Sequence, residues 1–170
     1  MSILLDHSLI RRLSGSEPEP RYRMLETLRE YGLEQLSADG DAARATGAHA
    51  LYFHGLAKAA EPELTGSAQG QWLARLQSEH DNLRAALAWA LARDHDDPQA
   101  RQDGVEAGLR LAGSLWRFWS IRGYAYEGRA WLERLLSVEI GAGSKETKAI
   151  RAAALRGAAA LAYGQGDYTW

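Results

Sequence analysis

The residues that could do chemistry are few, and they form no catalytic arrangement. The chain has five histidines and no cysteine, which excludes disulfides, thiolate metal sites and cysteine nucleophiles. His49 and His54 are five residues apart, so they diverge on a helix and do not form the i, i+4 pair of a zinc site. No serine stands with a histidine and an acid in a recognisable motif. We therefore expect no enzymatic activity, no bound metal and no cofactor.

Two segments have some of the residues of a nucleotide site. Gly141-Ala142-Gly143-Ser144-Lys145 has glycines and a lysine, but not in the order Gly-x4-Gly-Lys-Ser/Thr in which backbone amides wrap phosphates. Asp96-Asp97 lacks the hydrophobic strand that precedes the acidic pair of a nucleotide-hydrolysing site. The first segment is better interpreted as a linker and the second as a loop.

Aromatic residues supply one candidate binding surface, a partner or ligand groove lined by Trp116, Trp119, Trp131 and Tyr124. Aromatic residues at helical spacing more often belong to a core, which is the interpretation we favour. His80 lies within an apolar stripe, which predicts a buried histidine bonded to a neighbouring carbonyl rather than a ligand or a switch.

Four arginines fall on an expected N-terminal β-hairpin and are candidate phosphate contacts: Arg11, Arg12, Arg21 and Arg23. Glu17 and Glu19 between the strands oppose such contacts. The 20 basic and 22 acidic residues leave a formal charge of −2, which is no general footprint for nucleic acid. We favour a solvated hairpin face and expect no direct DNA binding.

The elements that carry these residues are almost all helical. With 170 residues, of which 46% are hydrophobic, the chain suits one folded domain or a short repeat array. No apolar run is long enough for a bilayer and no signal peptide opens the chain, so we expect a cytoplasmic location and no membrane. The exception to the helices is a hairpin within 8–25 around the turn formers at 14–20. Helices are expected over 26–37, 41–60, 68–92, 104–122, 124–137 and 145–163.

Three boundaries depend on single residues. Gly40 and Gly123 are expected to end the helices before them. The stripe over 68–92 fits one helix or two, and Ser78 to Asp81 resembles a capping box, which favours a break near 78–80. The segment from Asp94 to Asp103 is expected to be a polar loop.

The predicted fold is all-α, with antiparallel helical hairpins in a TPR-like repeat array and a small N-terminal β-hairpin. The last segment fits the start of a tetratricopeptide repeat at Leu155, Ala158, Ala159, Ala162, Gly166 and Tyr168. The second helix of that repeat is missing, which leaves an apolar face uncovered. We expect a longer native polypeptide, a partner or a second copy to cover it.

Three ordered landmarks resemble those of large bacterial signal-transduction ATPases, the LuxR-type and AfsR-like regulators with an NB-ARC (STAND-type) nucleotide-binding module. They are residues 21–32 (RYRMLETLREYG), 79–91 (EHDNLRAALAWAL) and 115–132 with its Leu-Trp-Arg-Phe-Trp and Glu-Gly-Arg-Ala-Trp-Leu sequences. The resemblance covers nearly the whole chain, although the ATPase module itself is absent from it.

The resemblance implies that residues 1–38 are the C-terminal edge of a winged-helix domain and that 39–170 form a TPR-like region with an incomplete last repeat. It also implies a non-catalytic sensor-relay role, in which a ligand, a partner protein or the remainder of the polypeptide is coupled to an ATPase switch outside this chain. The alternative is a free-standing TPR-like scaffold that homodimerises through its open last repeat or binds a partner protein in its helical groove.

Overall fold

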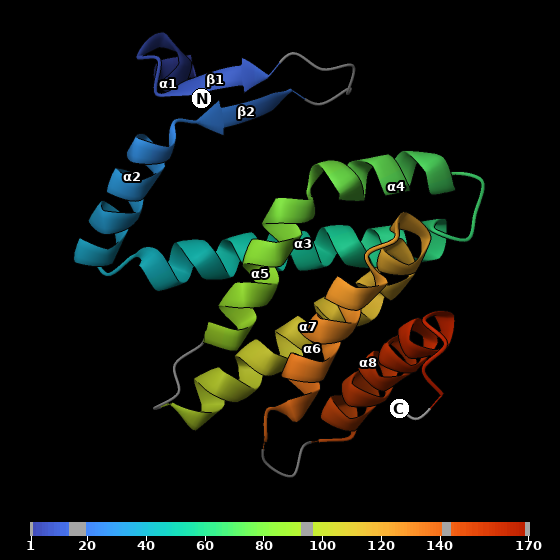
Figure 1. The fold of residues 1–170 in the computed structure, drawn as a ribbon. Coiled ribbons are helices and arrows are strands. Elements are labelled where there is room, and N and C mark those ends of the chain that lie inside the picture. Colours follow the sequence, from blue (N-terminus) through green and yellow to red (C-terminus); the bar gives the residue numbers. More distant parts are fainter. Residues whose placement is uncertain (1, 14–19, 93–96, 141–143, 169–170) are drawn as a thin grey trace. The chain divides into compact units, whose positions relative to one another are not determined.

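The computed structural model describes residues 2–13, 20–92, 97–140 and 144–168 (Figure 1). These residues form eight helices and one two-stranded antiparallel sheet, which confirms the predicted all-α fold with a small hairpin. The chain divides into two compact units, residues 1–45 and 46–170, which meet inside α3 (Ala42–Glu63). The domain boundary predicted from the sequence lies between residues 38 and 39. None of the described helices is both long and apolar enough to span a membrane.

The first unit contains α1 (Ser2–Asp6), β1 (Ile10–Leu13), β2 (Arg21–Met24) and α2 (Glu26–Ala38). The two strands pair with Ile10 opposite Met24, as expected of a hairpin, while residues 14–19 between them lie outside the described part. Helix α2 ends at the predicted place, because Gly40 takes a left-handed φ of +76°.

The apolar face of α2 is not part of a core within its unit. Leu28, Leu33 and Leu36 fall on or near one face of α2, as the spacing predicted. None of them is buried, however, and Leu33 is exposed, as is Leu25 just before the helix.

The second unit contains most of α3, followed by α4 (Gln69–Ser78), α5 (His80–Ala92), α6 (Pro98–Arg122), α7 (Ala125–Ser137) and α8 (Lys145–Gly164). Helix α6 packs against α5, α7 and α8, and consecutive helices from α6 to α8 run in opposite directions (Figure 1). The predicted break near 78–80 is confirmed, with Glu79 between α4 and α5. All members of the stripe across these two helices are buried: Leu73, Leu76, His80, Leu83, Leu87 and Ala90.

The start of α6 corrects the predicted polar loop over 94–103. The helix begins at Pro98, because Asp97 caps it by accepting from the backbone N–H groups of Gln99 (2.9 Å) and Ala100 (3.2 Å). Pro98 suits the first helical position, where no intrahelical N–H bond is lost. The first turns of α6 are polar, so apolar periodicity did not reveal that they are helical. Residues 93–96 lie outside the described part of the chain.

Helix α6 has two apolar stripes in its sequence and is buried on two sides. All their residues are buried except Trp116, which is partly buried: Val105, Leu109, Ala112, Trp116 and Trp119 on one stripe, and Leu111, Leu115 and Phe118 on the other. Neighbouring helices come close at glycines. A Cβ at Gly108 would lie 2.6 Å from Leu135 of α7, and a Cβ at Gly128 of α7 would overlap the indole ring of Trp119. The packing of α6 against α7 therefore requires glycine at positions 108 and 128.

The substitution Gly128→Ala should lower the free energy of unfolding by about 1–3 kcal/mol, because the new methyl group collides with a buried ring that cannot turn away. The matched control is Gly55→Ala in α3, where a Cβ meets nothing within 4 Å. That variant should be stabilised by up to ~1 kcal/mol through helix propensity. Urea unfolding followed by circular dichroism measures both. Equal stability of the two variants would contradict the packing described here.

Candidate functional site

Two of the four aromatic groove candidates lie in separate helix–helix contacts. Trp119 is 1% exposed and lies over Gly128 of α7. Trp116 packs toward α8, where a Cβ on Gly157 would lie 3.1 Å from Trp116 Cβ. The two indoles therefore face different partner helices and do not line a common groove.

The other two candidates lie elsewhere. The side-chain amide nitrogen of Gln77 in α4 lies 2.9 Å from Tyr124 Oη and donates to it. Trp131 is partly buried, with the guanidinium of Arg134 5.1 Å from the centre of its ring. Neither residue lines the pocket described below.

His80 is a core residue, as predicted, with 6% of its surface exposed. Its ring packs against Phe118 and Tyr124, with 5.4 Å and 4.4 Å between ring centres. Nε2 lies 3.2 Å from Glu127 Oε1 but makes no well-directed hydrogen bond with any described residue. The polar group beside Nε2 is thus a carboxylate and not the backbone carbonyl that the sequence predicted.

The charge state of this cluster follows from its contacts. Burial lowers the pKa of His80 below its ordinary value, although Glu127 opposes the shift. Arg84 binds Glu127 through two bonds of 2.7 Å and 2.6 Å and thereby lowers the pKa of that carboxyl group. Near neutral pH the cluster holds a neutral imidazole beside an ionised carboxylate, and the arginine links α5 to α7.

The hairpin register decides how the four arginines are placed. Arg11 lies opposite Arg23, and Leu13 lies opposite Arg21. Because side chains alternate along a strand, Arg11, Arg21 and Arg23 share one face, while Arg12 lies on the other face. Arg11, Arg12 and Arg23 are exposed. Like charges directly opposite each other weaken a hairpin slightly. Contact with phosphate stays a prediction.

The nucleotide-like segments fall partly outside the described residues, which omit Asp96 and Gly141–Gly143. Of the residues of these segments that the structure describes, Asp97 caps the N-terminus of α6 and Ser144 caps the N-terminus of α8. Across the described ranges, no group of three or more histidines, aspartates or glutamates is placed to hold a metal ion.

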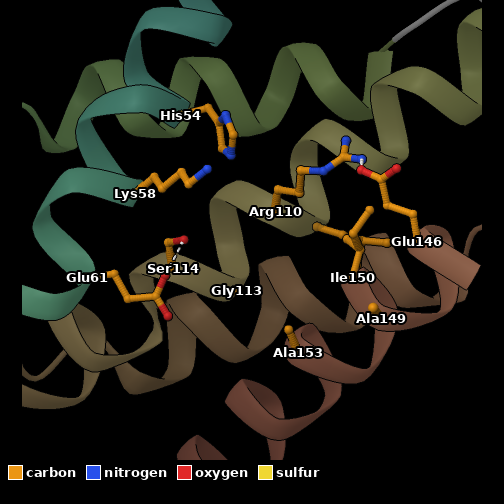
Figure 2. Close-up of a pocket in the computed structure, with 11 residues that line it drawn as sticks. His54, Lys58, Glu61, Arg110, Gly113, Ser114, Glu146, Ala149, Ile150 and Ala153 are labelled. Carbon is orange, nitrogen blue, oxygen red and sulfur yellow. Dashed lines mark hydrogen bonds and ion pairs between the residues drawn. The ribbon is translucent and has the colours of Figure 1, made fainter.

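A pocket of about 340 Å³ lies between α3, α6 and α8 of the second unit (Figure 2). Helix α3 lines it with His54, Lys58 and Glu61, and α6 contributes Arg110 and Ser114. Helix α8 supplies a largely aliphatic wall: Ala149, Ile150 and Ala153. The pocket therefore combines charged groups on one side with small apolar groups on another.

Only some of the polar side chains that line the pocket are paired with another residue in the described part of the chain. Ser114 Oγ donates to Glu61 Oε2 at 2.9 Å, and Arg110 Nη2 lies 3.0 Å from Glu146 Oε1. Figure 2 shows His54 and Lys58 reaching from α3 into the space beside Arg110. The Lys58 ammonium forms no ion pair or hydrogen bond with any residue in the described ranges. Burial lowers the pKa of half-buried His54, and nearby Arg110 and Lys58 lower it further.

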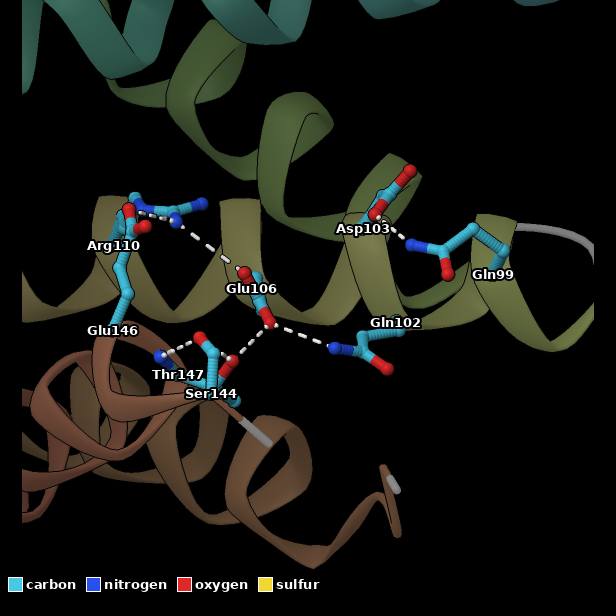
Figure 3. A network of polar contacts seen from close by, with 8 residues as sticks. All are labelled: Gln99, Gln102, Asp103, Glu106, Arg110, Ser144, Glu146 and Thr147. Atoms are coloured by element: carbon cyan, nitrogen blue, oxygen red, sulfur yellow. Dashed lines mark hydrogen bonds and ion pairs between the residues drawn. The ribbon is translucent and has the colours of Figure 1, made fainter. Parts of the chain in front are cut away.

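A network behind the pocket holds Arg110 in place (Figure 3). Glu106 accepts from Thr147 Oγ1 at 2.6 Å, which is the main cause of its lowered pKa, and also binds Arg110 at 3.3 Å. Ser144 caps α8 by accepting from the backbone N–H of Thr147 at 3.2 Å. The first turn of α8 is thereby fixed to α6, which sets the position of the arginine.

This pocket was not predicted from the sequence, where His54 was considered only as a partner for His49. His54, Lys58 and Glu61 nevertheless share one helix face at spacings of four and three residues. That spacing was the available signal. Arg110 and Ile150 come from helices far along the chain, and no local pattern joins them to α3.

Comparison with known proteins finds relatives among bacterial regulators. One protein of Mycobacterium bovis and two of Mycobacterium tuberculosis strains, each described as "Putative HTH-type transcriptional regulator", are 32% identical to the chain over 161 residues. The alignment covers 95% of this chain and 17% of each relative, so the chain spans about a sixth of their length. No family model matches the chain, and no solved structure matches it significantly.

His80 and the pocket residue His54 both make the stability of the fold depend on pH. The folded-state pKa of His80 lies below its ordinary value of 6.5, so the unfolded chain takes up the proton first as the pH falls. The buried, neutral His80 ring therefore makes its full contribution to the free energy of unfolding above pH 6.5. This contribution is lost as the pH drops from 6.5 toward the folded-state pKa. His54 contributes with the same sign.

We therefore expect the free energy of unfolding to decrease between pH 7 and pH 5, and to decrease less in the variants His80→Gln and His54→Gln. Denaturant titrations across this range measure the slope. An NMR titration of the His80 ring in the unaltered chain gives a second readout, with a midpoint below 6.5 expected. A midpoint above that value would contradict the assignment of His80 as a buried neutral ring.

Proposed function

We propose that the chain is a non-catalytic interaction segment of a transcriptional regulator. The observation that carries the proposal is the 32% identity to HTH-type regulators, which extends over 95% of this chain and so includes both units. The helical architecture supports a binding role, because stacked helices present grooves to partners. We also place the polypeptide in the cytoplasm, where transcription is regulated in bacteria.

In its finer form, the proposal follows the resemblance to NB-ARC regulators. Residues 1–38 would then be the edge of a winged-helix domain, and residues 39–170 the start of a TPR-like region. Their task is to couple a ligand, a partner protein or the remainder of the polypeptide to an ATPase switch outside this chain. Such a relay requires that the bound molecule favours one of two arrangements of the polypeptide over the other.

The helices of the second unit suit this task in two respects. Each of α6, α7 and α8 packs on the other two, so a displacement of one helix alters its contacts with both of the others. The pocket is lined by α3, α6 and α8 together, so an occupant touches three helices at once. Binding there stabilises whichever arrangement of these helices fits the occupant best.

Chromatin immunoprecipitation of the endogenous polypeptide that contains this chain tests the proposal. We expect enrichment at specific promoters, with transcription from those promoters changed when the gene is deleted. The purified 170-residue chain should not bind the enriched fragments in fluorescence anisotropy at physiological salt.

Either of two outcomes would count against the proposal. Absence of site-specific enrichment would remove the assignment to a regulator. Salt-dependent binding of the fragments by the chain alone, lost in Arg11→Ala and Arg23→Ala variants, would instead make the hairpin a DNA contact.

A further inference from the structure

We propose that the pocket between α3, α6 and α8 binds a small organic carboxylate that carries a short aliphatic chain. The inference rests on the combination of two cations from different helices, a half-buried imidazole and an aliphatic wall around one pocket of about 340 Å³. A volume of this size suits a small molecule better than a folded partner.

The polar end of the pocket favours an anion. Lys58 of α3 and Arg110 of α6 both line the pocket, with His54 beside Lys58, and the Arg110 guanidinium is turned toward Glu146 (Figure 2). Lys58 has no ion pair in the described part of the chain, so its charge is available to a ligand. Burial is the main cause of the lowered pKa of His54, and the further lowering by Arg110 and Lys58 is consistent with a positive potential at this place.

The acidic residues of the pocket do not cancel this preference. Glu61 is engaged by the Ser114 hydroxyl. The Glu146 side chain is 75% exposed, so its ion pair with Arg110 is weak and a ligand carboxylate can replace it. Arg110 would keep its orientation on such a replacement, because Glu106 also binds its Nη2 atom, at 3.3 Å.

The apolar end favours a short aliphatic chain. Ile150 of α8 lines the pocket together with Ala149 and Ala153, which are about one helical turn apart. Gly113 of α6 lies across from them, with the backbone of Ala154 at ordinary contact distance from where a Cβ would stand. These small residues leave room for a few methylene groups beside the wall of α8.

The binding equilibrium is independent of the proposed function, whereas the role of this ligand as the signal of a regulator rests on that function. Isothermal titration calorimetry with the purified chain tests the binding directly. The probe is hexanoate, and its matched controls are butanoate, hexan-1-ol and hexylamine. Hexanoate should bind saturably, and butanoate roughly tenfold more weakly because it lacks two methylene groups. The uncharged and cationic probes should bind at least tenfold more weakly than hexanoate.

Variants identify the site. Lys58→Gln should weaken hexanoate binding about tenfold through loss of a charged partner, whereas Lys148→Gln, at an exposed position of α8 outside the pocket, should leave it unchanged. Ala149→Leu should weaken binding by placing a larger side chain in the pocket, whereas Ala152→Leu, also at an exposed position of α8 but outside the pocket, should not. Circular dichroism confirms that each variant is folded.

Three results would overturn the proposal: no binding of hexanoate, tighter binding of hexylamine, or equal affinities in Lys58→Gln and Lys148→Gln. These results differ from a failure of the proposed function. Hexanoate binding without promoter occupancy would leave the pocket assigned and the regulator role refuted, and the reverse combination would refute the ligand alone.

Discussion

The close approach of α6 to its neighbours is the constraint on which the second unit depends. Trp119 is accommodated only because Gly128 has no side chain, and Gly108 makes room for Leu135 in the same way. Trp116 lies against Gly157 of α8 with little space to spare. Each large side chain buried in this way contributes roughly 1.5–3 kcal/mol to stability. The glycines therefore determine how closely α7 and α8 lie beside α6.

The pocket is a consequence of the same arrangement. Helix α6 presents large apolar groups to α5, α7 and α8, and it presents Arg110, Gly113 and Ser114 to the pocket. Small residues of α8 face this side, so the space is not filled. Glu106, between the core and the pocket, ties the first turn of α8 to α6. One helix therefore organises both the core and the site at which we place a ligand.

Much of the fold could be predicted from the sequence because its signals are local. The stripe from Leu73 to Ala90 gave both the helices and their buried face, and Gly40 and Gly123 ended helices through their left-handed backbone. The start of α6 was predicted wrongly, because a cap at Asp97 outweighs a polar first turn. Helix α2 was predicted correctly, yet none of its residues is buried. Periodicity identifies an apolar face but does not say whether the same unit supplies its cover.

The candidate site was much harder to predict. The tryptophans stood out by residue type, yet Trp119 is committed to packing. The pocket draws Lys58, Arg110 and Ile150 from three helices, and their proximity depends on tertiary packing that no spacing encodes. Charged and small apolar residues are also common on helices. Only their convergence distinguishes them from an ordinary solvated face.

Hydrogen–deuterium exchange of the chain with and without saturating hexanoate tests most directly the claim that α6 joins the core to a ligand pocket. We expect α6 to exchange most slowly in the free chain. We also expect hexanoate to slow exchange further in α3, α6 and the first turns of α8, and to leave exchange in β1, β2 and α2 unaffected. Fast exchange in α6, or ligand protection confined to residues outside these three helices, would contradict it.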